Sequence, residues 1–101
     1  MELSDYELYL SDWVKTKLLM KEPPISIDEV EEAFFNCTGI YIKEVRSEHE
    51  TIPPTFWFIS DTSECRVLKI CFIPIFDKKR IILKTAFDAE EWEIDEYESY
   101  K

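Results

Sequence analysis

The sequence predicts an α+β domain in which helices pack on a small antiparallel sheet, in the order α-α-β-β-β-β-α. Three observations lead to this prediction. Apolar residues recur at helical spacing in the first third of the chain, three strand-like runs follow within residues 55–87, and a strongly acidic segment comes last. A chain of 101 residues with 46% hydrophobic content fits a single domain, residues 1–101, with a modest core.

Two helices are expected before the sheet. Residues 4–20 carry apolar side chains at roughly helical spacing, Ser4 or Asp5 can cap the segment, and the pair Pro23-Pro24 breaks the chain after it. Residues 26–36 then begin with Ser26 and Glu29, the spacing of a capping box. Apolar side chains on one face of this second helix are expected to pack on the sheet.

Four strands are expected next, at residues 40–45, 55–61, 66–73 and 80–87. The connections between the last three are short, which favours antiparallel neighbours. In the first of these three, Phe56 and Phe58 share one face, so core packing is their expected use. A final helix follows Asp88 as its cap, and Trp92, Tyr97 and Tyr100 are expected to anchor it to the sheet.

Charge is distributed unevenly along the chain. The formal net charge is −10, with −6 in residues 1–42, +2 in residues 43–87 and −6 in residues 88–101. A strongly negative protein repels phosphates as a whole, yet basic residues gathered beside the predicted sheet can still bind them at short range.

Several classes of function are not indicated by the composition. A single glycine excludes a Walker loop and the glycine fingerprint of dinucleotide-binding folds. Three cysteines without a CxxC spacing indicate neither a disulfide framework nor a zinc site. We therefore expect no metal and no cofactor. No apolar run is long enough to cross a bilayer and the N-terminus lacks a basic signal-peptide region, so a cytoplasmic protein without membrane contact is expected.

Basic residues on the strands are the first candidates for chemistry. Strict alternation along residues 80–87 places on one face Arg80, Ile82, Lys84 and Ala86. If this strand forms a hairpin with the preceding one, Lys69 and Lys84 share an exposed face, and His49 from the nearby loop can add a group that titrates near neutrality. The alternative is that these cations only keep a solvated sheet face soluble and protect its edges.

Short motifs in the second half of the chain resemble those of a toxin family. They are His49-x-x-x-Pro53-Pro54-Thr55-x-Trp57-Phe58-Ile59, Arg66-x-Leu68-Lys69-Ile70-x-Phe72-Ile73, Ile82-x-Lys84-Thr85-Ala86 and Glu93-x-x-x-Tyr97. Together with the helix at residues 26–36 they resemble the BrnT toxins of the broader RelE-like superfamily, in an uncharacterised branch. The likeness covers roughly residues 25–98.

The resemblance implies a toxin of a type II toxin–antitoxin system, with RNA as substrate and an antitoxin protein as partner. A metal-independent ribonuclease would use a base to activate the 2′-hydroxyl and cations to stabilise the phosphorane. By resemblance, Lys69 and Lys84 would stabilise the phosphate, Arg46 or Arg66 would assist, and His49 would be the acid or base. Arg66, Arg80 and Tyr97 would then contact the substrate.

A second hypothesis is open beside the first. In it, two acidic helices engage a basic partner without catalysis. The seven acidic residues between 88 and 98 can imitate a phosphate backbone, as in a nucleic-acid mimic or inhibitor. The plainest interpretation of such a run is a solvated helix face.

Overall fold

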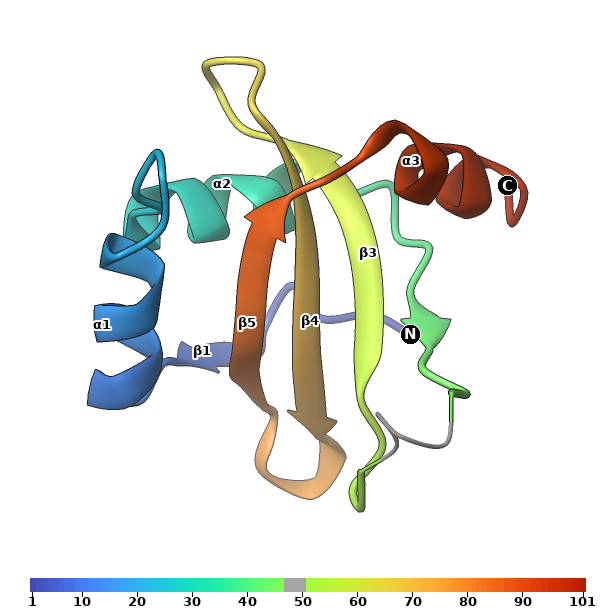
Figure 1. Cartoon of the computed structure of the whole chain (residues 1–101). Coiled ribbons are helices and arrows are strands. Elements are labelled where there is room, and N and C mark those ends of the chain that lie inside the picture. Colours follow the sequence, from blue (N-terminus) through green and yellow to red (C-terminus); the bar gives the residue numbers. More distant parts are fainter. Residues whose placement is uncertain (47–50) are drawn as a thin grey trace.

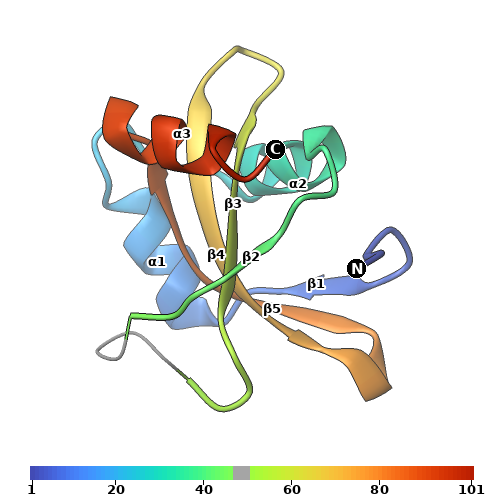
Figure 2. The ribbon, with the colours of Figure 1, turned by 90° about the vertical axis from the view of Figure 1, so that its right-hand side faces the viewer.

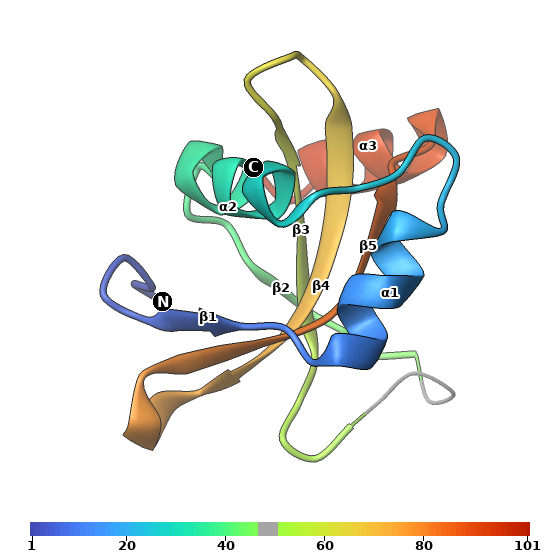
Figure 3. The ribbon, with the colours of Figure 1, turned by 90° about the vertical axis from the view of Figure 1, so that its left-hand side faces the viewer.

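A computed structural model describes residues 1–46 and 51–101 and has an α+β architecture (Figure 1). In order, its helices and strands are β1 (Glu7–Tyr9), α1 (Asp12–Leu19), α2 (Ile27–Asn36), β2 (Ile42–Lys43), β3 (Phe56–Asp61), β4 (Val67–Ile75), β5 (Arg80–Asp88) and α3 (Glu91–Glu98). Within the described residues the strands form one sheet in the order β1-β5-β4-β3-β2. Figures 2 and 3 show α2 on one face of the sheet and α1 and α3 on the other side.

The three long strands confirm the predicted antiparallel arrangement. β3 pairs with β4 and β4 pairs with β5, both antiparallel, and their bounds lie within two residues of those predicted. β2 is shorter than the strand predicted for residues 40–45, because only Ile42 and Lys43 pair with β3 in the ladder.

The N-terminal segment differs from its prediction. A helix was predicted for residues 4–20, but Glu7–Tyr9 forms β1, which pairs in parallel with β5, and α1 begins only after Ser11. The Ser11 hydroxyl accepts a hydrogen bond from the Val14 amide at 3.2 Å and caps the helix there. Residues 7–9 form a strand despite their helical spacing, because they pair with the edge of β5. The sheet is therefore mixed, and the element order gains a strand at its start.

The predicted capping box of α2 is confirmed. The Ser26 hydroxyl accepts from the Glu29 amide at 3.1 Å, and the Glu29 carboxylate accepts from the Ser26 amide at 3.0 Å. Val30 and Ala33, on the sheet-facing side of the helix, are completely buried. This helix therefore covers the inner face of the sheet, which we define as the face toward α2.

The core lies between α2 and this inner face. Its aromatic centre consists of Phe58 and Phe72 from the sheet, with Phe34 and Tyr41 packed on them edge to face at centroid distances of 4.9–5.6 Å. Phe56 also points inward and stacks on Phe72. The expectation that Phe56 and Phe58 share a face and pack in the core is thereby confirmed.

Helix α3 lies across the upper end of the outer face in Figure 1. Its cap is Glu90 rather than the predicted Asp88, because Asp88 is the last residue of β5 and its carboxylate binds Arg66. Tyr97 is buried, as expected of an anchor, but Trp92 is 55% exposed and does not anchor the helix. Tyr100 is half exposed and still reaches the Trp57 ring edge to face.

Candidate functional site

Lys69 is buried, which contradicts its predicted place on an exposed face. β4 directs it to the outer face, where α3 covers it, and its ammonium donates to the Glu93 carboxylate at 3.2 Å. The two side chains are only 3% and 7% exposed. The Lys69 nitrogen also lies 4.4 Å from the Trp57 ring centroid, a favourable cation–π position. Lys69 thus fastens α3 to the sheet and is closed to a phosphate.

Lys84 occupies a β-bulge, which corrects the predicted alternation along β5. Thr85 pairs with Cys71 while Leu83 pairs with Phe72, so Lys84 is the extra residue between two ladder positions. The bulge moves Arg80 and Ile82 onto the same face as Thr85 and away from Ala86, which is buried on the inner face. Partly exposed Lys84 lies close enough to Cys71 for its charge to lower the thiol pKa, although burial dominates and raises that pKa.

Arg46 forms an ion pair at the end of β2. Its guanidinium donates twice to the buried Glu44 carboxylate, at 2.9 and 3.1 Å. These hydrogen bonds, with a smaller contribution from the charge of Lys69, lower the pKa of Glu44 to about 2. Arg46 itself stays half exposed. Glu44 was not among the predicted site residues, and it is the carboxylate that holds Arg46 in place.

Arg66 is a structural clamp. It binds Asp88 bidentately at 2.7 and 2.8 Å, reaches the Glu29 carboxylate at 3.2 Å, and donates to the carbonyls of Pro23 and Pro24 at 2.8 and 2.7 Å. These contacts raise the pKa of Arg66 and hold that of Asp88 below its usual range. The pKa of Glu29 is also lowered, first by the hydrogen bond from the Ser26 amide and then by Arg66. The Arg66 donors are occupied by the fold, which leaves none free for a substrate.

The remaining candidates are separated from one another. Tyr97 is buried on α3, where its hydroxyl donates to the Ile40 carbonyl at 2.6 Å, and burial raises its pKa to about 12. Arg80 is exposed at the start of β5, opposite Ile75. His49, the predicted acid or base, lies outside the described residues. Among the described candidates, electrostatic interactions connect only Lys69, the Arg46–Glu44 pair and Lys84, around Cys71 and Glu93.

Three acids of α3 are exposed and unpaired among the described residues, in contrast to the buried Lys69. Glu93 is bound by Lys69 and Glu98 by Lys101, while Glu91, Asp95 and Glu96 are exposed and make no ion pair with any described residue. Trp92 stands among them with more than half of its surface in solvent. This acidic face of α3, defined as Glu91, Trp92, Asp95 and Glu96, combines negative charge with a large amphipathic ring.

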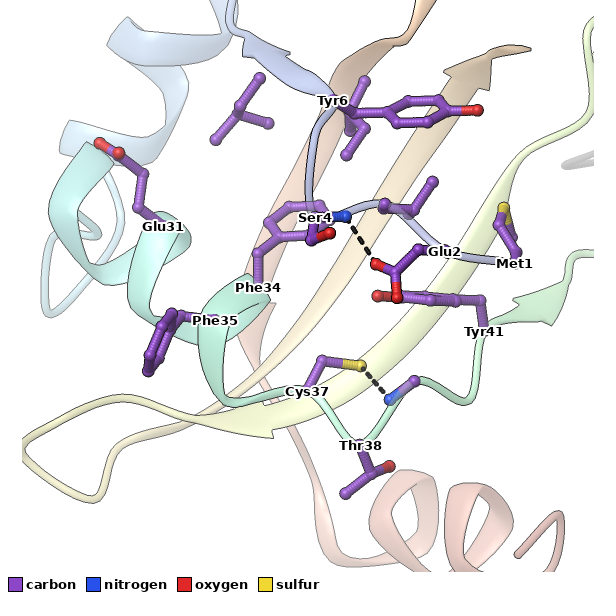
Figure 4. Close-up of a pocket in the computed structure, with 14 residues that line it drawn as sticks. Met1, Glu2, Ser4, Tyr6, Glu31, Phe34, Phe35, Cys37, Thr38 and Tyr41 are labelled. Atoms are coloured by element: carbon purple, nitrogen blue, oxygen red, sulfur yellow. Dashed lines mark hydrogen bonds between the residues drawn. The ribbon is translucent and has the colours of Figure 1, made fainter.

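A pocket on the other side of the molecule was not predicted from the sequence. It lies between the N-terminal segment, the end of α2 and the turn that follows (Figure 4). Its walls include Tyr6, Phe34, Cys37 and Tyr41. No sequence motif predicts this pocket. Residues 1–6 are placed next to residues 37–41 by strand β1, which was not predicted, and by the packing of Tyr41 in the core.

Neither a metal site nor a covalent crosslink is found in the part of the chain that the structure describes. No group of three or more His, Cys, Asp or Glu side chains there has a geometry that could hold a metal ion. Cys37, Cys65 and Cys71 are free thiols. No helix among these residues is long and apolar enough to cross a membrane.

No protein-family model and no curated protein matches the sequence. The resemblance to BrnT toxins therefore stays a prediction from the sequence.

Proposed function

We propose that this protein is a non-catalytic acidic protein that binds a basic partner through the acidic face of α3. One observation carries the proposal: two of the predicted catalytic or substrate-binding cations are bound by carboxylates, whereas three acids of α3 make no ion pair with any described residue. Lys69 and Arg66 are held by carboxylates, whereas Glu91, Asp95 and Glu96 face solvent.

Electrostatics favours such an interaction. A formal net charge of −10 attracts cationic proteins over several ångströms and speeds their encounter. An exposed Trp92 adds a large contact area and a ring face for a lysine or arginine of the partner. The acidic side chains attract the partner electrostatically, and the Trp92 ring provides a contact surface from which water is excluded on binding.

The helix is rigidly placed for this role. The buried Lys69–Glu93 pair and the hydrogen bond from Tyr97 to the Ile40 carbonyl fix its inward side on the sheet. A preorganised surface binds with a smaller loss of conformational entropy than a flexible one. The outward side can therefore meet a partner without rearrangement.

Calorimetry with an octalysine peptide at low salt tests this proposal. The triple variant Glu91→Gln, Asp95→Asn, Glu96→Gln should bind about tenfold more weakly than the natural chain, since each lost charge contact is worth a few tenths of a kcal/mol.

A matched control removes three other exposed acids, which lie on β1, α1 and the β4–β5 connection: Glu7→Gln, Asp12→Asn, Asp77→Asn. It changes the net charge equally and should retain most of the affinity. Equal weakening in both triple variants would show attraction by net charge alone and would overturn the proposal.

A toxin-like ribonuclease is the second candidate. The observation that favours it is that two cations of β5 stay accessible: Arg80 is exposed and shares the outer face with Thr85, and Lys84 at the bulge is partly exposed. An attacking 2′-hydroxyl would meet cationic groups there.

Growth arrest on expression, relieved by Lys84→Ala but not by the surface variant Lys15→Ala, would support the ribonuclease. Harmless expression together with intact RNA after incubation would exclude it. Lys69→Ala is unsuitable for this test, because it breaks a buried ion pair.

A further inference from the structure

The pocket beside the N-terminal segment has the size and lining of a binding site. Its volume is about 700 Å³, and ligand pockets typically enclose several hundred cubic ångströms. In Figure 4 the rings of Tyr6, Phe34 and Tyr41 surround the space from three different segments. Phe34 and Tyr41 are fixed by edge-to-face contacts with Phe58 and Phe72, so these walls are preformed.

The charge of this pocket is negative. Glu2 and Glu31 line it beside Met1, and none of the described lining residues is a lysine or arginine. The Ser4 amide donates to the Glu2 carboxylate at 2.8 Å, which holds the pKa of Glu2 below its usual value and keeps it ionised. This carboxylate lies beside the Tyr41 hydroxyl in Figure 4, and its charge contributes to the raised pKa of Tyr41. Charge and aromatic faces therefore converge in one space.

We propose that this pocket receives an arginine side chain of the basic partner, an inference that rests on the function proposed above. A guanidinium stacks on aromatic faces and pairs with a carboxylate through two parallel hydrogen bonds. Its methylene stem can pack along Phe34 and Leu3. Glu2 uses one oxygen for the Ser4 amide and retains acceptor sites for the guanidinium.

The pocket is connected with α3. Thr38 lines both this pocket and a neighbouring groove that is bounded by Tyr97 and Glu98 of α3 and by Lys101, whose ammonium is paired with Glu98. One extended partner can therefore contact the helix and place an arginine in the pocket. Two linked contacts raise affinity because the second binding event becomes intramolecular.

NMR titration with a capped pentapeptide, Ala-Ala-Arg-Ala-Ala, tests the inference on the intact chain. The amides of Thr38, Gly39 and Tyr41 should shift saturably, with a dissociation constant on the order of millimolar for a single side chain. The same peptide with citrulline in place of arginine keeps the shape and removes the charge, so it should bind at least about fivefold more weakly.

Variants locate the contact. Glu2→Gln should weaken arginine-peptide binding about fivefold, whereas Glu7→Gln, which removes the same charge outside the pocket, should leave it unchanged. Equal binding of the citrulline peptide, or equal effects of the two variants, would overturn the inference. If octalysine binding still depends on the acidic face of α3 in that case, the pocket assignment alone fails. If that dependence is also absent, the proposed function fails with it.

Discussion

Lys69 shows how far a single residue can depart from what its strand pattern predicts. In the sequence Lys69 stands between apolar residues, a pattern typical of a cation on the solvent-exposed face of a strand. In the structure α3 covers that face, and its Glu93 forms an ion pair with Lys69. The partner lies 24 residues away, and no local pattern connects the two. Tyr97 was predicted as an anchor together with Trp92 and Tyr100, but the sequence did not distinguish the ring that is buried from the two that stay exposed.

Truncation of Lys69 tests its structural role. Lys69→Ala should lower the free energy of unfolding by about 3–5 kcal/mol, because Glu93 would remain buried without a counter-charge. Chemical denaturation measures this loss. The double variant Lys69→Met, Glu93→Leu should recover most of it, since apolar residues of similar volume replace a buried pair well. A Lys69→Ala variant as stable as Lys15→Ala would contradict the buried pair.

Glu44 gives the protein an acid-sensitive contact. Its pKa falls from 4.5 to about 2 in the folded state. A lowered pKa stabilises the fold above the unfolded-state value and loses this effect as the pH falls toward the folded-state value. We therefore expect the unfolding free energy to drop by on the order of 1–3 kcal/mol between about pH 5 and pH 2 from this group.

Denaturation curves of the natural chain and of Glu44→Gln across that pH range measure the contribution. The variant should be less stable at neutral pH and show a shallower loss on acidification. Parallel pH profiles would mean that Glu44 does not titrate with a lowered pKa.

Among the elements, those that depend on local chemistry were predicted and those that depend on long-range pairing were not. The capping box of α2 lies within four residues, so Ser26 and Glu29 suffice to predict it. β1 forms only because the edge of β5 accepts it more than 70 residues later, and the bulge at Lys84 appears only when β4 and β5 are aligned. That bulge also explains why Ala86 was predicted on the wrong face, whereas Lys69 is not an exposed cation because α3 covers it.

Arg66 joins β4, β5, α2 and the segment before α2, so its removal should affect several elements together. Arg66→Lys keeps the charge but cannot reproduce the bidentate contact with Asp88 or the additional hydrogen bonds to Pro23 and Pro24. We expect a loss of about 2–3 kcal/mol in unfolding free energy, measured by denaturation. The exposed Arg80→Lys provides the control, and equal effects of the two substitutions would contradict the clamp.

For the molecule as a whole, some charges form ion pairs between elements, and other charges, including Glu91, Asp95 and Glu96 of α3, stay exposed. Basic residues beside the sheet in the sequence suggested a cationic site, yet the fold turns two of them, Lys69 and Arg66, into ties between elements. The net charge can be counted from the sequence, but which acidic and basic side chains form ion pairs depends on the fold. For this reason the proposed basic partner is inferred from the net charge and the exposed acids, and not from any individual basic residue.

Salt should weaken the proposed interaction strongly. Exposed acids attract a basic partner through water, and the screening length shortens from about 10 Å at 0.1 M salt to about 3 Å at 1 M. The octalysine affinity, measured by calorimetry, should therefore fall about tenfold or more between 0.05 and 0.5 M salt. An affinity independent of salt would mean that apolar contact alone drives binding.

The position of the bound peptide gives the most direct test of partner binding through α3. In an NMR titration of the isotope-labelled protein with octalysine, the largest amide shifts should fall within residues 91–98 and include the indole of Trp92, while the outer face of β5 around Lys84 stays unchanged. Shifts spread evenly over all exposed acids, or concentrated away from this helix, would contradict it.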